Sequence, residues 1–95
     1  MPFLILFEDA LGHDDTRAAH MQAHLSFLAA HGDTVRAAGP LFDQGAAAGG
    51  AWVVEVETRQ AAQALVEADP FWPTGLRKSV RILEWRHVFA DGAAV

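Results

Sequence analysis

Pro2-Phe3-Leu4-Ile5-Leu6-Phe7 is an uninterrupted apolar run, and Glu8-Asp9 ends it at once. Six residues are too few to cross a membrane, and no basic residues flank the run as they flank the apolar part of a signal peptide. A short continuous run of this kind is typical of a strand that is buried on both faces. Either both faces of the sheet that holds this strand are covered within the chain, or some of its apolar surface meets a partner.

Two later segments have the apolar periodicity of helices. Residues 17–30 repeat apolar side chains at helical spacing and stop before Gly32. Residues 58–68 form the second predicted helix, which Thr58 can cap with its hydroxyl group. The predicted inner stripe of this second helix is Ala61, Ala64, Leu65 and Ala68.

Three other segments have the character of strands, namely residues 34–41, 52–57 and 78–89. The glycine- and alanine-rich stretch between the first two predicts a flexible hairpin connection over 43–50, with its turn at Gly49-Gly50. Residues 90–95 are expected to form a frayed tail.

The predicted order is β-α-β-β-α-β, which is the order of the ferredoxin-like α+β fold. In that fold two helices cover one face of an antiparallel sheet and leave the other face bare. Because the first strand is apolar on both sides, a second copy is expected to cover the bare face. The predicted assembly is a homodimer with the architecture of a dimeric α+β barrel. At 95 residues the chain is expected to be one domain spanning 1–95.

The composition excludes several classes of function. The formal net charge is -5 and the seven basic residues are scattered, so we expect no binding to nucleic acid. The absence of cysteine excludes disulfides, a thiolate nucleophile and a cysteine zinc site. Without a predicted membrane span or signal segment, the expected location is cytoplasmic and no membrane partner is expected.

His24 and Asp69 are the candidate catalytic residues. Asp69 precedes Pro70, which ends the second helix, and in an antiparallel helix pair this end lies near the N-terminal half of the first helix. A buried carboxylate beside an imidazole fixes its tautomer and favours its charged form. From the residues alone, the pair could carry acid–base chemistry or could be a hydrogen bond that only links the two helices.

His20 and His24 also have the i, i+4 spacing of helical metal ligands. A third ligand would have to come from Asp69, His13 or His87, and the glutamate of the zinc-protease motif is missing between the two histidines. We therefore expect neither a metal nor another cofactor, and we interpret His20 as an ordinary helix histidine.

Five further residues are candidates for binding a small-molecule ligand, namely Arg17, Gly39, Pro40, Phe71 and Trp72. Arg17 can neutralise an anionic substrate or can be a solvated residue at a helix start. Phe71 and Trp72 can line an apolar pocket or anchor the loop. Gly39 and Pro40 shape a turn that can bring a backbone N–H near the pocket. Trp52 is interpreted as a core or interface residue.

Three short motifs carry a resemblance when they are taken together. His24-Leu25, Gly39-Pro40-Leu41 and Asp69-Pro70-Phe71 resemble motifs of the YCII-related family of small bacterial proteins, over roughly residues 3–85. The resemblance implies a ferredoxin-like homodimer with a His–Asp pair, here His24 and Asp69, at a pocket for a small molecule. One activity described in that family is dechlorination of a hydroxylated aromatic compound.

The chain departs from the family pattern in three places, namely His20, Ala46-Ala47-Ala48 and Trp72-Pro73. These departures affect the shape of the pocket. Two hypotheses follow for the function. In the first, the chain is an enzyme that uses the His–Asp pair for elimination, isomerisation or dehalogenation of a small substrate, either aromatic or enolisable. In the second, it is a non-catalytic metabolite-binding or structural dimer module.

Overall fold

The computed structural model describes all of residues 1–95. Its main elements are β1 (Pro2–Asp9), α1 (Asp14–Ala30), β2 (Val35–Asp43), β3 (Ala46–Glu55), α2 (Arg59–Ala68) and β4 (Arg77–Glu84). A 3-10 turn over Trp72–Thr74 precedes β4, and two short strands, β5 (Phe89–Ala90) and β6 (Ala93–Ala94), follow it.

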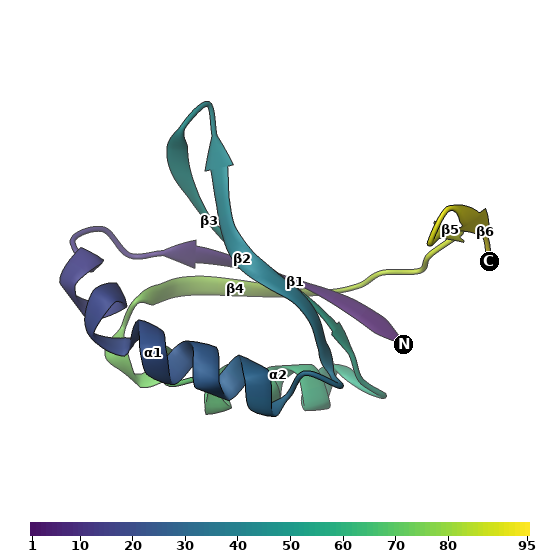
Figure 1. Ribbon diagram of the computed structural model, residues 1–95, viewed down its shortest axis with the longest axis horizontal. Coiled ribbons are helices and arrows are strands. Elements are labelled where there is room, and N and C mark those ends of the chain that lie inside the picture. Colours follow the sequence, from purple (N-terminus) through teal and green to yellow (C-terminus); the bar gives the residue numbers. More distant parts are fainter.

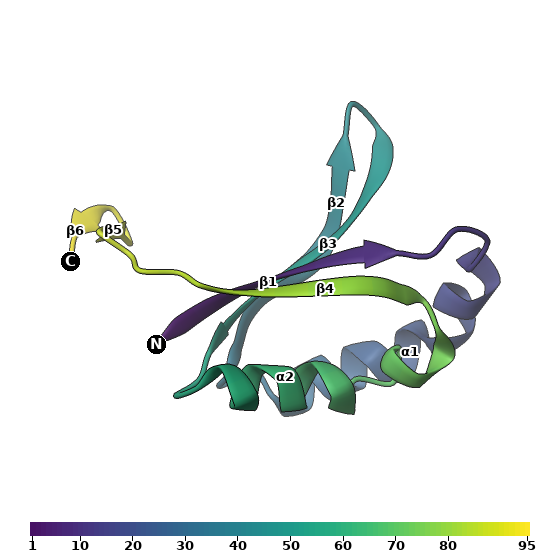
Figure 2. The same ribbon diagram turned by 180° about the vertical axis from the view of Figure 1, so that it is seen from behind.

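The four main strands form one antiparallel sheet in the order β2-β3-β1-β4. Both helices lie on the same face of this sheet, as Figures 1 and 2 show from opposite sides. In the ladder, Ile5 of β1 lies opposite Trp52 of β3 and Ile82 of β4. The predicted ferredoxin-like α+β fold is therefore confirmed.

The core lies between the sheet and α2. Its sheet residues are Phe3, Ile5, Phe7, Trp52, Val54 and Ile82, and its helix residues are Ala62, Leu65 and Val66. The predicted helix stripe was correct only at Leu65, because Ala61, Ala64 and Ala68 are exposed. A stripe that contains Val66 removes more apolar surface from water than a stripe of alanines. Asp69, four residues after Leu65, continues the buried stripe beyond the end of the helix.

The β2–β3 hairpin is longer than predicted, and the predicted turn at Gly49-Gly50 is wrong. The turn lies at Gln44-Gly45, whose φ angles are 51° and 84°. Positive φ at both loop residues is typical of two-residue hairpins. Gly49 is instead part of β3, where its φ is 89° and a Cβ atom would lie 2.0 Å from the carbonyl oxygen of Phe7. Glycine is required at this position because of a close backbone approach, which a local turn pattern does not reveal.

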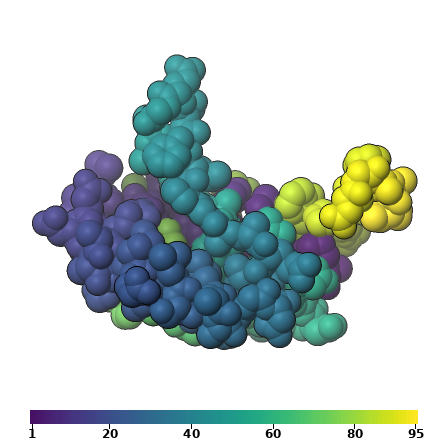
Figure 3. All heavy atoms as spheres, viewed as in Figure 1, coloured from purple at the N-terminus to yellow at the C-terminus, as the bar shows by residue number.

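An irregularity in the β2–β3 ladder lies close to Gly49. The register shifts between Pro40 and Phe42. Such a bulge bends a strand pair and increases its twist. The far half of the hairpin accordingly rises away from the sheet and stands out from the body of the molecule (Figures 1 and 3).

The C-terminal part also differs from the prediction. β4 ends at Glu84 instead of Phe89, because its partner strand β1 begins opposite this point. Glu84 lies opposite Phe3, and the last hydrogen bond between the two segments is from the Trp85 N–H to the Pro2 carbonyl. The expected frayed tail is a small β5–β6 hairpin with Asp91-Gly92 as its turn. This hairpin stands apart from the sheet (Figure 1).

The face of the sheet without helices carries apolar side chains. Leu4 lies opposite Val53 and Leu83 in the ladder, and these three side chains are partly exposed, as is Leu6. The opposite side of β1 is buried, so this strand is apolar on both faces as expected. Neither helix is long and apolar enough to span a membrane.

Candidate active site

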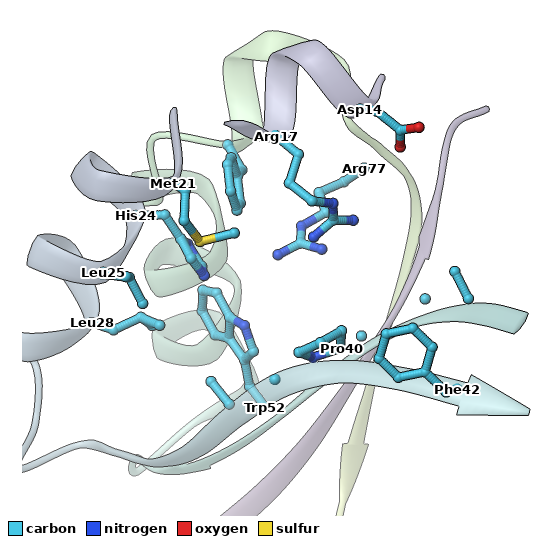
Figure 4. A pocket seen from close by; sticks show the side chains of 16 residues that line it. Asp14, Arg17, Met21, His24, Leu25, Leu28, Pro40, Phe42, Trp52 and Arg77 are labelled. Atoms are coloured by element: carbon cyan, nitrogen blue, oxygen red, sulfur yellow. The ribbon is translucent and has the colours of Figure 1, made fainter. Parts of the chain in front are cut away.

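A cavity of about 340 Å³ lies between α1 and the β2–β3 hairpin. One wall comes from α1, with Arg17, Met21, His24, Leu25 and Leu28. The opposite wall comes from the hairpin, with Gly39, Pro40, Phe42, Ala47 and Gly49. Trp52, Phe71 and Arg77 also line the cavity. Figure 4 shows these side chains converging from the helix and from the strands. The bend near Gly49 therefore gives the hairpin its position as a wall of the cavity.

His24 is the only buried residue of α1, with 8% of its surface exposed. Its Nδ1 lies 2.9 Å from Oδ1 of Asp69. Its ring stacks on the ring of Phe71, with 4.2 Å between the centroids and 23° between the planes. A carboxylate only accepts hydrogen bonds, so Nδ1 is the donor. Nε2 has no partner in the chain and is the nitrogen left for a molecule in the cavity.

Asp69 is held by the local backbone. It follows the last residue of α2 and has an extended conformation, with φ -65° and ψ 133°, which proline at the next position favours. Its side chain turns inward and is 2% exposed. The Phe71 N–H donates to Oδ1 at 3.2 Å, which is the local bond of an Asx turn. The sequence Asp69-Pro70-Phe71 thus orients the carboxylate toward α1 and provides the phenyl ring that stacks on His24.

A cluster of three charged residues lies next to this pair. Nη1 of Arg77 donates to Oδ1 of Asp9 at 2.9 Å, and Arg17 bonds the other oxygen of the same carboxylate. The Arg77 guanidinium also lies over the ring of Phe7, 4.1 Å from its centroid, and its Nη2 is 4.0 Å from Oδ2 of Asp69. The charge of Arg77, which lines the cavity, therefore lies close to two carboxylates.

The sequence did not single out Asp9 or Arg77. Asp9 and Arg77 are partners at the ends of the β1–β4 ladder, where the register is irregular. Opposite charges at facing positions of two antiparallel strands are a recognisable signal. The facing charges of Asp9 and Arg77 can be recognised only when the register of β1 and β4 is known, and the sequence patterns do not give that register.

Of the other candidate residues, four line the cavity and one does not. Arg17, Gly39, Pro40 and Phe71 line the cavity. Trp72 does not line it and packs against the core cluster instead. Trp52, interpreted from the sequence as a core or interface residue, is 2% exposed and contacts both the core and the cavity.

The histidines considered as metal ligands are not brought together. His13, His20 and His87 do not line the cavity with His24. No three His, Cys, Asp or Glu side chains lie close enough together to hold a metal ion. His87 instead packs against Trp85, beyond the end of β4.

Two substitutions of Asp69 separate the shape of its side chain from its charge. Asp69→Ala leaves buried donors on His24 and Phe71 without an acceptor, so we expect the free energy of unfolding to fall by about 2–4 kcal/mol. Asp69→Asn keeps an acceptor oxygen and the side-chain volume, so we expect it to lower the free energy of unfolding by a clearly smaller amount than Asp69→Ala. Urea denaturation of both variants measures the difference. Equal losses would contradict the view that hydrogen bonding at Asp69 organises this region.

Comparisons with known proteins agree with the fold and the family resemblance. A sequence model of the YCII-related domain matches residues 1–86. A similar solved structure is 5-chloro-2-hydroxyhydroquinone dehydrochlorinase from Burkholderia phenoliruptrix AC1100 in complex with 2,5-dihydroxybenzoquinone, with a TM-score of 0.80 and 28% identity over 92% of this chain and 95% of that one. No curated protein matches the chain. The match over residues 1–86 shows that the chain belongs to the YCII-related domain family.

Proposed function

We propose that this protein is an enzyme that moves protons on a small ring compound bearing oxygen substituents. His24 is the general acid and base, and Asp69 is the residue that orients it. One observation carries the proposal: a buried carboxylate holds Nδ1 of His24, while the ring lines a cavity and Nε2 has no partner in the chain. This is the arrangement in which an imidazole can accept and return a proton.

The other walls of the cavity suit a flat ring. Phe71, Trp52, Pro40 and Met21 present apolar surfaces, and the volume of about 340 Å³ is in the range of sites for small molecules. The similar dehydrochlorinase is named for a chlorinated hydroxyhydroquinone, and its structure holds a dihydroxybenzoquinone. This likeness supports a small hydroxylated ring as the class of substrate.

The proposed chemistry needs only a positioned proton carrier. His24 Nε2 accepts a proton from a ring hydroxyl, and the protonated imidazole then gives a proton to a ring carbon, which converts the hydroxyl form into its ketone isomer. If that carbon carries a halogen, loss of halide together with a proton from a second hydroxyl completes elimination of hydrogen halide. Isomerisation and dehalogenation therefore share their first step, and no external oxidant or reductant is required.

The same cavity could bind such a compound without turnover, as a metabolite-binding module. Two features favour the enzyme. The His24–Asp69 bond is buried, and the free nitrogen of the imidazole is at the cavity instead of being used in a second structural hydrogen bond. A residue with only a structural role has no need of a free nitrogen at that place.

His24→Ala is expected to reduce kcat/KM by about 10²–10⁴-fold, which is the usual contribution of a general acid or base. The assay is chloride release from 5-chloro-2-hydroxyhydroquinone, with quinone formation followed by absorbance. His20→Ala is the matched control, because His20 is on the same helix and does not line the cavity.

Activity of His24→Ala within about twofold of the parent would contradict the catalytic role. A parent protein that binds 2,5-dihydroxybenzoquinone and a panel of halogenated and halogen-free hydroxyquinols without converting any of them would favour the binding module.

We also propose that the protein is a homodimer. The partly exposed apolar row Leu4, Val53 and Leu83 occupies the sheet face that no helix covers. A second copy that packs its own row against this one would bury both, in the face-to-face manner of two stacked sheets.

Light scattering after gel filtration should give twice the mass of the chain at micromolar concentration, and Leu4→Glu should give the mass of one chain. A charge on the open face is costly to bury in the dimer but is solvated in the monomer. A monomeric parent protein, or a Leu4→Glu variant that stays dimeric, would contradict this interface.

A further inference from the structure

We infer that the indole N–H of Trp52 donates a hydrogen bond to the substrate oxygen from which His24 takes a proton. The inference rests on the proposed function and deepens it, because it adds a donor for the negative charge that forms on that oxygen. An indole N–H is only a donor, so Trp52 binds and stabilises the oxygen without transferring a proton itself.

The indole nitrogen of Trp52 is a donor that the chain does not use. Nε1 has no hydrogen-bond partner in the chain, and it is not among the unpaired polar atoms that are sealed from solvent. Trp52 as a whole is only 2% exposed, and it lines the cavity. The small exposed part of this side chain therefore includes Nε1, and the space that Nε1 faces is the cavity. A buried tryptophan usually has an acceptor for this group.

The core fixes the direction of this donor. Trp52 lies opposite Ile5 in the β1–β3 ladder and belongs to the core cluster. Its ring contacts the ring of Phe7 edge to face, with 5.1 Å between the centroids and 61° between the planes. The N–H is therefore oriented before any ligand binds, and a donor that is oriented in advance needs no reorganisation when charge develops near it.

The donor and the proposed base border the same space. The centroids of the His24 and Trp52 rings are 6.2 Å apart, and each ring has one nitrogen without a partner in the chain. Figure 4 shows the Trp52 ring beside His24, with its nitrogen on the side toward Pro40. A hydrogen bond to nitrogen spans about 3 Å, so one oxygen between the two rings can reach both nitrogens.

The proposed proton transfer gives this contact a catalytic effect. When His24 accepts the proton of a ring hydroxyl, the O–H bond breaks and its electron pair stays on the oxygen, which becomes negative. A hydrogen bond to a charged oxygen is stronger than one to a neutral hydroxyl. The Trp52 N–H therefore stabilises the charged state more than the bound substrate, and a difference of this kind raises kcat instead of lowering KM.

Trp52 could instead serve only as a core ring and a wall, with its N–H bonded to water in the cavity. The indole signals in a nitrogen–proton correlation spectrum of the isotope-labelled parent protein separate the two roles. The chain has three tryptophans, and Trp72→Phe and Trp85→Phe identify the Trp52 signal by removing the other two. The probe is 2,5-dihydroxybenzoquinone, an acidic enol that is ionised at neutral pH.

Binding of the quinone should move the Trp52 indole proton downfield and slow its exchange with water. The signals of Trp72 and Trp85 should change little, because neither residue lines the cavity. His24→Ala should lose turnover and keep the response of Trp52, which separates this inference from the catalytic role of His24.

Kinetics of Trp52→Phe give a second test, because phenylalanine keeps an aromatic ring and removes the donor. With 5-chloro-2-hydroxyhydroquinone, kcat should fall by about 10–100-fold while KM stays within about threefold of the parent. Trp85→Phe is the matched control, since it is the same substitution outside the cavity.

A bound quinone that leaves the Trp52 signal unchanged would overturn the inference and leave the proposal for His24 in place. An unchanged kcat in Trp52→Phe would overturn it as well, including the case in which only KM rises. A parent protein that neither binds nor converts any of the ring compounds would overturn the proposed function and this inference together. The spectrum is recorded on the parent protein, so it decides the matter even if Trp52→Phe does not fold.

Discussion

The hydrogen bond between Asp69 and His24 is the interaction on which the site depends. A carboxylate buried to 2% exposure is costly unless its oxygens are paired. The pairing here comes from His24 on α1 and the Phe71 N–H of the loop, with Arg77 of β4 nearby. Because the three groups come from different parts of the chain, satisfying one carboxylate brings α1, the loop after α2 and the start of β4 to one place.

The position of α1 explains why the molecule has a cavity. α2 buries three apolar residues against the sheet, whereas His24 is the one buried residue of α1, and Leu25 of α1 is 51% exposed. Part of the inner face of α1 thus lines the cavity instead of closing onto the core. The bent β2–β3 hairpin forms the opposite wall. Apolar contacts that would have stabilised a filled core are absent here, which is a common cost of a functional site.

The fold was predictable from the sequence because its signals are local and repeated. The continuous apolar run of β1, the Thr58 cap and the helical spacing of 17–30 each specify one element, and their order specifies the topology. The contact between His24 and Asp69 followed from the antiparallel helix pair and from Pro70, which ends α2.

The remaining features depend on partners that are distant in the sequence. Gly49 is needed because β3 passes close to the Phe7 carbonyl, and β4 ends where β1 begins. The meeting of Arg77 with Asp9 requires the register of two strands that lie 68 residues apart at these positions. Trp72 could not be assigned to the core or to the cavity because adjacent loop residues face different ways. Local periodicity contains none of this information.

A crystal structure of the protein with 2,5-dihydroxybenzoquinone tests the central claim most directly. We predict that the ring lies in the cavity between α1 and the hairpin, with one of its oxygens about 2.6–3.2 Å from Nε2 of His24 and with Nδ1 still bonded to Asp69. A ligand bound elsewhere, or one bound in the cavity with no atom within reach of Nε2, would contradict it.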